Sequence, residues 1–192
     1  MLPAIAVFAK APAPGRVKTR LAVKIGAEQA AKVYERMVSV LLQRLIQAAK
    51  SLASDVELHT DTRSDAWGGF AVTRRLQASG DLGARMLHAL ETGLAEGRAR
   101  VLIVGGDVPT VPISHLEELL AADADVALGP AEDGGFWGIC CRKTDAAMFA
   151  GVTWSTASVC AETAAACRRA GLSVFIGSTW FDIDEPSDLE RI

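Results

Sequence analysis

Short apolar segments alternate with helical patterns along the whole of this 192-residue chain. Segments such as AIAVFA and VLIV contain no polar residue, which is typical of strands buried on both faces of a parallel sheet. Between them, apolar residues recur at helical spacing. The alternation predicts a three-layer α/β/α sandwich around a mostly parallel, mixed sheet. We expect strands at 3–9, 55–60, 70–77, 100–107, 125–130, 136–141 and 172–177, helices at 27–50, 82–96, 112–121 and 157–170, and a last helical turn after Pro186.

The chain is expected to form one domain over residues 1–192. Half of its residues are hydrophobic (50%) and 22% are charged, which is typical of a folded protein and excludes a disordered one. A chain of this length buries about 70% of its unfolded surface on folding. We find no linker, internal repeat or low-complexity stretch that would divide it.

Charge and hydropathy exclude several classes of partner. The net charge of −3 argues against general nucleic-acid binding, which usually requires a basic face. No apolar run approaches the roughly 18 residues of a membrane span, and the N-terminus lacks the basic region of a signal peptide. The four cysteines have no metal-binding spacing and are expected in the core. We therefore expect a cytoplasmic protein; a homodimer is compatible with the sequence, which does not set the oligomeric state.

The first candidate site is the loop KAPAPGRVKTR, residues 10–20, which follows the first expected strand. It carries four cations and no acidic residue. The chain has neither the Walker pattern GxxxxGK[ST] nor the dinucleotide pattern GxGxxG. Lysine and arginine can still hold phosphate oxygens, so a site for a small anion is one interpretation and a solvated basic loop is the other. The candidate residues are Lys10, Gly15, Arg16, Lys18 and Arg20.

The second candidate is Asp107, in the segment VLIVGGDVPTV. A buried strand runs into Gly105 and Gly106 and places this carboxylate at the sheet edge, where ligands bind in parallel α/β folds. A carboxylate there suits a hard cation such as Mg²⁺ or Mn²⁺. The alternative is a cap for the helix near Pro112, for which Asp107 lies too far upstream.

A third candidate lies near the C-terminus, in FDIDEPSDL. Asp182 and Asp184 flank one residue, so both side chains point the same way in an extended backbone. Two neighbouring carboxylates repel each other unless a proton or a cation lies between them. They are candidate metal ligands together with Asp107; the alternative is an acidic loop before the last helical turn.

Three further loops give weaker signals. QASGDLGARM offers backbone donors and an amide to a planar heterocycle and an arginine to phosphate; the alternative is a plain strand-to-helix connection. GPAEDGGFWGI combines an acid, two glycines and aromatics that suit an acceptor pocket, but Asp-Gly is also a strong hairpin signal. A similar polar and aromatic loop precedes helix 157–170. The candidate residues are Gln77, Gly80, Asp81, Gly83 and Arg85 in the first loop, Asp133, Gly134 and Gly135 in the second, and Trp154 and Ser155 in the third.

Taken in order, FAKAPAPGRVKTRL, QASGDLGARM, VGGDVPT, GPAEDGGFWGI and FDIDEPSDL resemble the bacterial family called radical-SAM/selenodomain-associated transferase 1. That family belongs to the nucleotide-diphospho-sugar transferase superfamily, which has the GT-A fold. The chain also resembles, more distantly, the phospholactate and phosphoenolpyruvate guanylyltransferases. The resemblance spans almost the whole chain. The first loop departs from the GxSxRxGxxK form of sugar nucleotidyltransferases, which leaves its phosphate contacts open.

The resemblance implies roles for the candidate residues. Asp107 corresponds to the metal-binding aspartate after the central strand, and Asp182 and Asp184 match a late pair that completes the metal site. The loop at 10–20 lies where nucleotidyltransferases hold the triphosphate, and the turn at 77–85 lies where they read the base. Asp133 to Gly135 and Trp154 to Ser155 are implied near the acceptor.

Together, these features predict a Mg²⁺- or Mn²⁺-dependent transferase whose partners are a nucleotide, an NTP or nucleotide-sugar, and a small acceptor. We favour nucleotidyl transfer to a phosphorylated or hydroxyl acceptor, because four cations suit a departing pyrophosphate. Lys18, Arg16 and Asp107 are the expected catalytic residues. A GT-A glycosyltransferase is the alternative, and a non-catalytic nucleotide-binding regulator is the third possibility.

Overall fold

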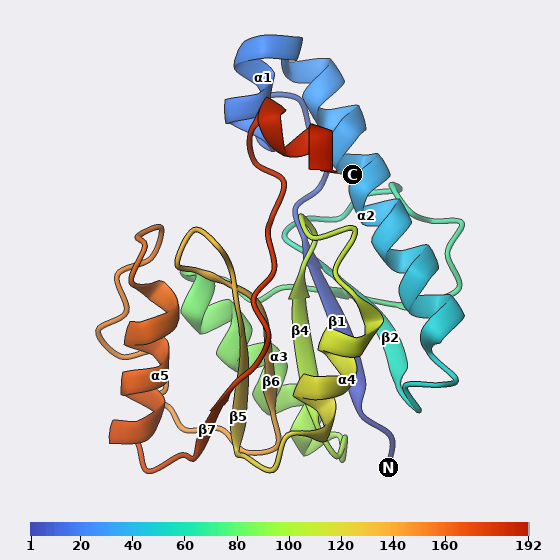
Figure 1. The fold of residues 1–192 in the computed structure, drawn as a ribbon. Helices are drawn as coiled ribbons and strands as arrows, with labels where there is room; N and C mark the ends of the chain where they lie inside the picture. Colours follow the sequence, from blue (N-terminus) through green and yellow to red (C-terminus); the bar gives the residue numbers. More distant parts are fainter. Residues whose placement is uncertain (192) are drawn as a thin grey trace.

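The computed structural model describes residues 1–191 and contains a seven-stranded sheet in the order β3-β2-β1-β4-β6-β5-β7 (Figure 1). β6 pairs antiparallel with β4 and β5, whereas the other neighbouring strands described are parallel. This arrangement confirms the mostly parallel, mixed α/β sheet. The strands are β1 (Ala4–Ala9), β2 (Asp55–Thr60), β3 (Thr73–Leu76), β4 (Val101–Gly105), β5 (Val126–Pro130), β6 (Phe136–Cys141) and β7 (Val174–Ile176).

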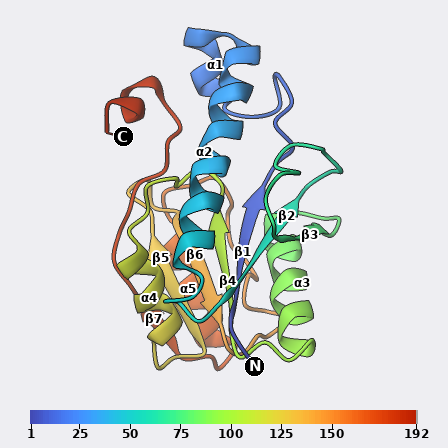
Figure 2. The same cartoon turned by 90° about the vertical axis from the view of Figure 1, so that its right-hand side faces the viewer.

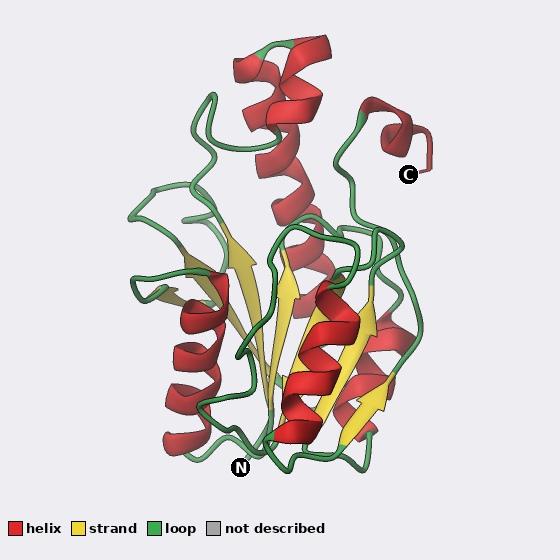
Figure 3. Ribbon diagram, turned by 90° about the vertical axis from the view of Figure 1, so that its left-hand side faces the viewer, coloured by secondary structure: helices red, strands yellow, loops and turns green. Residues whose placement is uncertain are grey.

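Helices cover both faces of the sheet, as the alternating pattern predicts. One core cluster joins the apolar residues of α2 and α4 to Ile5 and Val7 of β1, and Figure 2 shows α2 against this face. A second cluster joins those of α3 and α5 to Ala6, and these helices cover the face seen in Figure 3. The helices are α1 (Thr19–Ile25), α2 (Ala27–Ala48), α3 (Leu82–Ala95), α4 (Ile113–Ala121) and α5 (Val159–Arg169), with the 3₁₀ helix η1 (Pro186–Arg191). None of these helices is long and apolar enough to cross a membrane.

The register of the central strands places two loops side by side. Val7 of β1 pairs with Leu58 of β2 and Val104 of β4, and all three are fully buried. β1 and β4 therefore end at the same level, and the Gly106 amide donates to the Phe8 carbonyl at 2.9 Å. The loop after β1 and the loop after β4 consequently meet at the carboxyl edge of the sheet.

The expected irregular loop at 10–20 ends earlier than predicted, because α1 begins at Thr19. The sequence carries no signal for this helix. Lys18 at its N-cap makes no side-chain capping bond, and within the helix Leu21 is buried while Val23 is 89% exposed. Without a cap or an apolar stripe, a seven-residue helix cannot be recognised from its pattern.

A buried carboxylate lies on β2, away from the sheet edge just described. The Glu57 side chain is 6% exposed and accepts hydrogen bonds from Arg75 Nε at 2.8 Å and Arg98 Nη2 at 3.3 Å. His59 Nε2 lies 3.0 Å from the same carboxylate. The hydrogen bond to His59, together with the charge of Arg75, outweighs burial and holds the pKa of Glu57 below its usual value.

Glu57→Gln tests this cluster. Removing the carboxylate leaves two guanidinium groups without their buried partner, so we expect the free energy of unfolding to fall by about 3 kcal/mol at pH 7. Because the pKa of Glu57 is lowered in the folded state, this contribution is complete above the unfolded pKa of about 4.3 and is lost as pH falls through the folded value. Urea unfolding at several pH values should therefore show the difference shrinking under acid conditions.

The exposed Asp123 provides the matched control, because its side chain is 96% exposed although it pairs with Arg142. Asp123→Asn should change the free energy of unfolding by less than about 0.5 kcal/mol. A Glu57→Gln effect that stays constant across the acid range would contradict the assigned role of the carboxylate.

Candidate functional site

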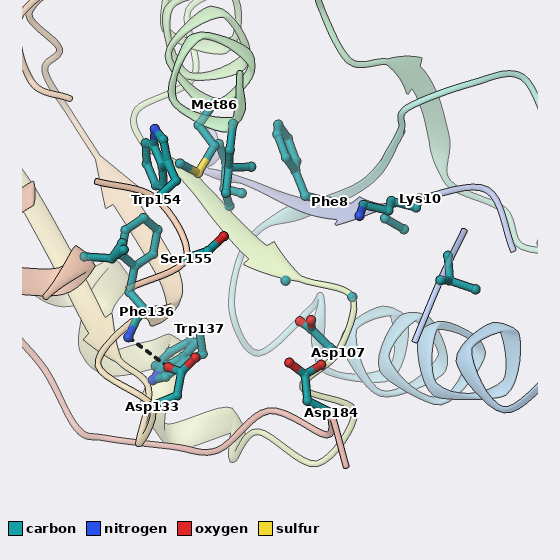
Figure 4. Close-up of a pocket in the computed structure, with 18 of the residues that line it drawn as sticks. Phe8, Lys10, Met86, Asp107, Asp133, Phe136, Trp137, Trp154, Ser155 and Asp184 are labelled. Carbon is teal, nitrogen blue, oxygen red and sulfur yellow. Dashed lines mark hydrogen bonds between the residues drawn. The ribbon is translucent and has the colours of Figure 1, made fainter. Parts of the chain in front are cut away.

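A cavity of about 610 Å³ opens at the carboxyl ends of β1 and β4 (Figure 4). The loop after β1 and the start of α3 line it on one side, and the turn before β6 lines it on the other. Because β6 runs antiparallel, its first residue, Phe136, lies at the edge where β1 and β4 end. The cavity thus occupies the position where ligands bind in parallel α/β folds.

The structure brings most of the predicted site residues to this cavity. Those in its lining are Lys10, Lys18, Arg20, Gln77, Arg85, Asp107, Asp133, Gly135, Trp154, Ser155 and Asp184. Those outside the lining are Gly15, Arg16, Gly80, Asp81, Gly83, Gly134 and Asp182.

Three carboxylates cluster at the floor of the cavity, where Asp107 and Asp184 belong to the lining and Asp182 lies just outside it. Asp107, Asp182 and Asp184 each offer an oxygen, and these oxygens lie within 4.8 Å of one another. The backbone amide of Ile183, which is fully buried, donates to the Asp107 carbonyl at 3.0 Å. This bond fixes the C-terminal segment to the loop after β4, and the aspartates on either side of Ile183 both reach the cluster.

A lysine bridges two of these carboxylates. Lys18 Nζ lies 2.5 Å from Asp184 Oδ1 and 3.3 Å from Asp107 Oδ2, and the lysine side chain is 5% exposed. Burial by itself would lower the pKa of Lys18, but the charges of Asp107 and Asp184 outweigh it and raise the pKa. Lys18 also has φ 45°, a left-handed conformation that costs a residue with a side chain about 1–3 kcal/mol. The two ion pairs stabilise this backbone.

The third carboxylate is not paired with that lysine among the described residues. Burial and the charges of Asp107, Asp184 and Asp133 raise the pKa of Asp182 to about 6. Arg20 also pairs with the cluster, since its Nη1 lies 3.9 Å from Asp184 Oδ2, but its side chain is 72% exposed, so excess negative charge remains. Three carboxylate oxygens at these separations, already facing a buried cation, fit the ligand preference of Mg²⁺ or Mn²⁺.

Lys18→Met tests whether the lysine ammonium occupies the place of a divalent metal ion. Without the ammonium, Asp107 and Asp184 repel each other, so the melting temperature in EDTA should fall by several degrees. Mn²⁺ should then bind at least about tenfold more tightly than to the wild type, because about 1.4 kcal/mol of competition is removed. Calorimetric titration and thermal unfolding measure the two effects.

Lys32→Met provides the control, since Lys32 is an exposed lysine of α2 outside the cavity lining. It should leave Mn²⁺ affinity unchanged. Equal or weaker Mn²⁺ binding by Lys18→Met would show that the lysine and a divalent cation do not compete.

Several predicted binding residues have protein partners instead of facing the cavity freely. Arg16 is 60% exposed and pairs with Asp61 at 3.4 Å. The Gln77 amide donates to the carbonyls of Ala9 and His59 at 3.2 and 2.9 Å. Its oxygen accepts a bond from Arg85 at 2.9 Å, so Gln77 orients that arginine.

Other predicted residues shape the walls. Asp81 caps α3, where its carboxylate accepts a bond from the Ala84 amide at 2.8 Å. Gly83 lies beneath Trp154, and a Cβ on it would lie 2.8 Å from the indole ring. Gly134 has φ 89°, and a Cβ there would lie 2.0 Å from the Ala157 carbonyl. These glycines allow close packing of the walls.

Tyr34 is a cavity residue that the sequence did not indicate. Its hydroxyl accepts a bond from the Lys10 amide at 3.0 Å, and burial, followed by the charge of Asp107, raises its pKa. Tyr34 lies on the apolar face of α2, and its spacing from Ala30 and Met37 is that of a core residue. No local signal distinguishes it from one.

The chain is similar to one family and to several solved structures. A model of the family described as "Uncharacterized protein conserved in bacteria (DUF2064)" matches residues 39–156. A protein from Desulfovibrio desulfuricans G20, provisionally named a nucleotide-diphospho-sugar transferase, is 34% identical over 96% of this chain and 84% of its own, with a TM-score of 0.86. None of the curated proteins searched matches.

More distant structures share the fold. CMP:2-keto-3-deoxy-manno-octonic acid synthetase, solved with CTP, is 13% identical over 100% of this chain and 96% of its own, with a TM-score of 0.62. The 2-C-methyl-D-erythritol 4-phosphate cytidylyltransferase of Thermus thermophilus is 13% identical over 100% of this chain and 97% of its own, with a TM-score of 0.57. At these identities the similarity shows the fold alone. The expected nucleotide-diphospho-sugar transferase type of fold is confirmed.

Proposed function

The chain belongs to the bacterial family DUF2064, and on this premise we propose that it is a metal-dependent transferase that uses a nucleotide substrate. The observation that carries the proposal is the charge pattern of one cavity. Lys10, Arg20 and Arg85 line it together with Asp107 and Asp184, which cluster with Asp182. Within residues 1–191, neither Lys10 nor Arg85 forms an ion pair, so two cations face the cavity without a counter-charge. A phosphate chain held between these cations and a metal ion fits this pattern.

Nucleotidyl transfer is the reaction that we favour. Lys10, Arg20 and Arg85 bind the phosphate chain and stabilise the negative charge of the departing pyrophosphate. Asp107, Asp182 and Asp184 would hold the Mg²⁺ or Mn²⁺ ion. When bound, that ion would supply charge neutralisation on the phosphate oxygens. Lys18, released from its carboxylates, is positioned to join the cations, and Arg16 lies further out beside Asp61.

Glycosyl transfer from a nucleotide-sugar is the second candidate. The observation in its favour is the provisional name of the relative that is 34% identical. The same carboxylates and cations would then stabilise a departing nucleoside diphosphate. The two reactions differ in their products, which makes them separable by experiment.

Narrower predictions from the sequence are part of this proposal. They are membership of the radical-SAM/selenodomain-associated transferase 1 group, one domain over residues 1–192 and a cytoplasmic location. The turn at 77–85 is proposed to read the base. The loops that hold Asp133 and Trp154 are proposed to contact a small acceptor.

Thermal-shift screening of the four NTPs and a set of nucleotide-sugars, with and without Mn²⁺, tests the proposal. We expect at least one nucleotide to raise the melting temperature of the wild type by several degrees in the presence of Mn²⁺. Asp107→Asn should abolish that shift, because it removes one of the three carboxylates that would hold the metal ion. Asp65→Asn, at an exposed aspartate outside the cavity lining, should behave as the wild type.

The products then identify the reaction. Released pyrophosphate indicates nucleotidyl transfer, and nucleoside diphosphate with a glycosylated acceptor indicates glycosyl transfer. Asp107→Asn should lower either rate by about 10²–10³. Binding without either product would favour a nucleotide-binding regulator, and the lack of any metal-dependent nucleotide binding would contradict both transferase forms.

A further inference from the structure

The two ends of the cavity differ in charge. Its cations come from the loop at 10–20 and from Arg85 on α3. The opposite end is lined from the segments 133–138 and 154–159, which contain no lysine, arginine or histidine. The titratable side chain in these segments is that of Asp133. A phosphate or carboxylate group placed at this end would therefore meet a like charge and no counter-charge from its own walls.

Neighbouring cations are engaged elsewhere. Arg85 donates to Gln77 Oε1 at 2.9 Å and to the Asp81 carbonyl at 3.3 Å, on the side of β1 and β2. Arg191 donates to both carboxylate oxygens of Glu132, at 2.8 and 3.0 Å, and its guanidinium lies 3.6 Å from the centre of the Phe181 ring. Neither arginine is free to turn toward the 133–138 segment without losing these contacts.

Aromatic side chains form the wall of this end. The ring of Trp154 lies 6.5 Å from that of Phe136 in an edge-to-face arrangement and 5.8 Å from that of Phe149. Met86 of α3 completes the wall, and Figure 4 shows it beside Trp154. Such surfaces bind flat or apolar groups.

This wall is held in place before any ligand binds. Trp154 packs on the first turn of α3 at Gly83, where any side chain would collide with it. The turn at Gly134 packs closely on Ala157, and the Cys160 amide donates to the Gly134 carbonyl at 3.0 Å. Two loops that are distant in sequence thus fix each other, which gives a preformed subsite.

In Figure 4, Asp133 lies below Phe136 on the side of the aromatic wall, and Asp107 and Asp184 lie across the cavity from it. Its Oδ1 accepts a bond from the Gly135 amide at 2.8 Å, and the structure gives Oδ2 no partner within residues 1–191. Asp133 lines the same cavity as Asp107 and Asp184. An exposed carboxylate there can accept a proton from a group bound against the aromatic wall.

We propose that the acceptor is an uncharged hydroxyl compound with an apolar or aromatic body, bound against Trp154 and Phe136, and not a phosphorylated compound. The proposal rests on the proposed function. In the nucleotidyl reaction, the hydroxyl oxygen forms a bond to the α-phosphorus and its proton passes to Asp133. The bond between the α-phosphorus and the bridging oxygen breaks, and pyrophosphate leaves with that electron pair.

A matched pair of probes tests the acceptor class: 3-phenyl-1-propanol and 3-phenylpropyl phosphate. Calorimetric titration is carried out with saturating tripolyphosphate, which occupies the cationic end and keeps the ester from binding there. The wild type should bind the alcohol at least about tenfold more tightly than the ester. Trp154→Ala should weaken alcohol binding at least about tenfold, whereas Trp154→Phe, which keeps an aromatic wall, should change it less.

Asp133→Lys supplies the counter-charge that this end lacks. It should tighten ester binding at least about tenfold relative to the wild type, whereas Asp123→Lys, at an exposed aspartate outside the cavity, should not. With nucleotide and Mn²⁺, Asp133→Asn should lower the rate of transfer to the alcohol by about 10²–10⁴ while leaving its dissociation constant within about twofold.

The proposal is overturned if the ester binds the wild type as tightly as the alcohol, or if neither probe binds. Because the titrations contain no nucleotide or metal, they decide the ligand class of this subsite even if nucleotide binding fails. Failure of the nucleotide screen with a positive alcohol titration would reject the transferase and keep the subsite. The reverse result would keep the transferase and reject the acceptor class.

Discussion

The ion pairs of Lys18 with Asp107 and Asp184 hold the site together. They join three segments that are distant in sequence: the loop after β1, the loop after β4 and the segment after β7. Without the lysine, the acidic residues of two of these segments would repel each other. Without the carboxylates, a largely buried ammonium and a left-handed backbone would lack compensation. The geometry of the cavity floor therefore depends on electrostatic balance as well as on the burial of Ile183.

The cationic end of the cavity is held by hydrogen bonds of its own. Lys10 is held through its backbone amide by Tyr34, which is itself packed in the core below. Gln77 ties β1 to β2 and orients Arg85. The cationic side chains thus project from groups whose backbone or neighbouring atoms are fixed. Preorganised charges of this kind cost little reorganisation when a polyanion binds.

The sheet was predictable because its central strands β1 and β4 are apolar runs whose burial requires two covering layers, as in AIAVFA and VLIV. The meeting of Asp182 and Asp184 was also predictable, since one buried residue, Ile183, separates them. The ion pair of Lys18 with Asp184 was not predictable. Asp184 lies 166 positions away in sequence, and a pattern within one loop carries no information about such a contact. Tyr34 escaped for a related reason, because a cavity residue on a helix has the spacing of a core residue.

The antiparallel direction of β6 divides the cavity between two parts of the chain. The cationic end comes from segments before residue 90, and the aromatic rings of the other end come from the hairpin into β6 and the loop before α5, with Met86 of α3 beside them. Substitutions in the hairpin can therefore change the shape and polarity of one end without altering the loop that carries the cations. Divergence within such a scaffold can proceed one end at a time, so that proteins with the same cationic end come to accept different second substrates.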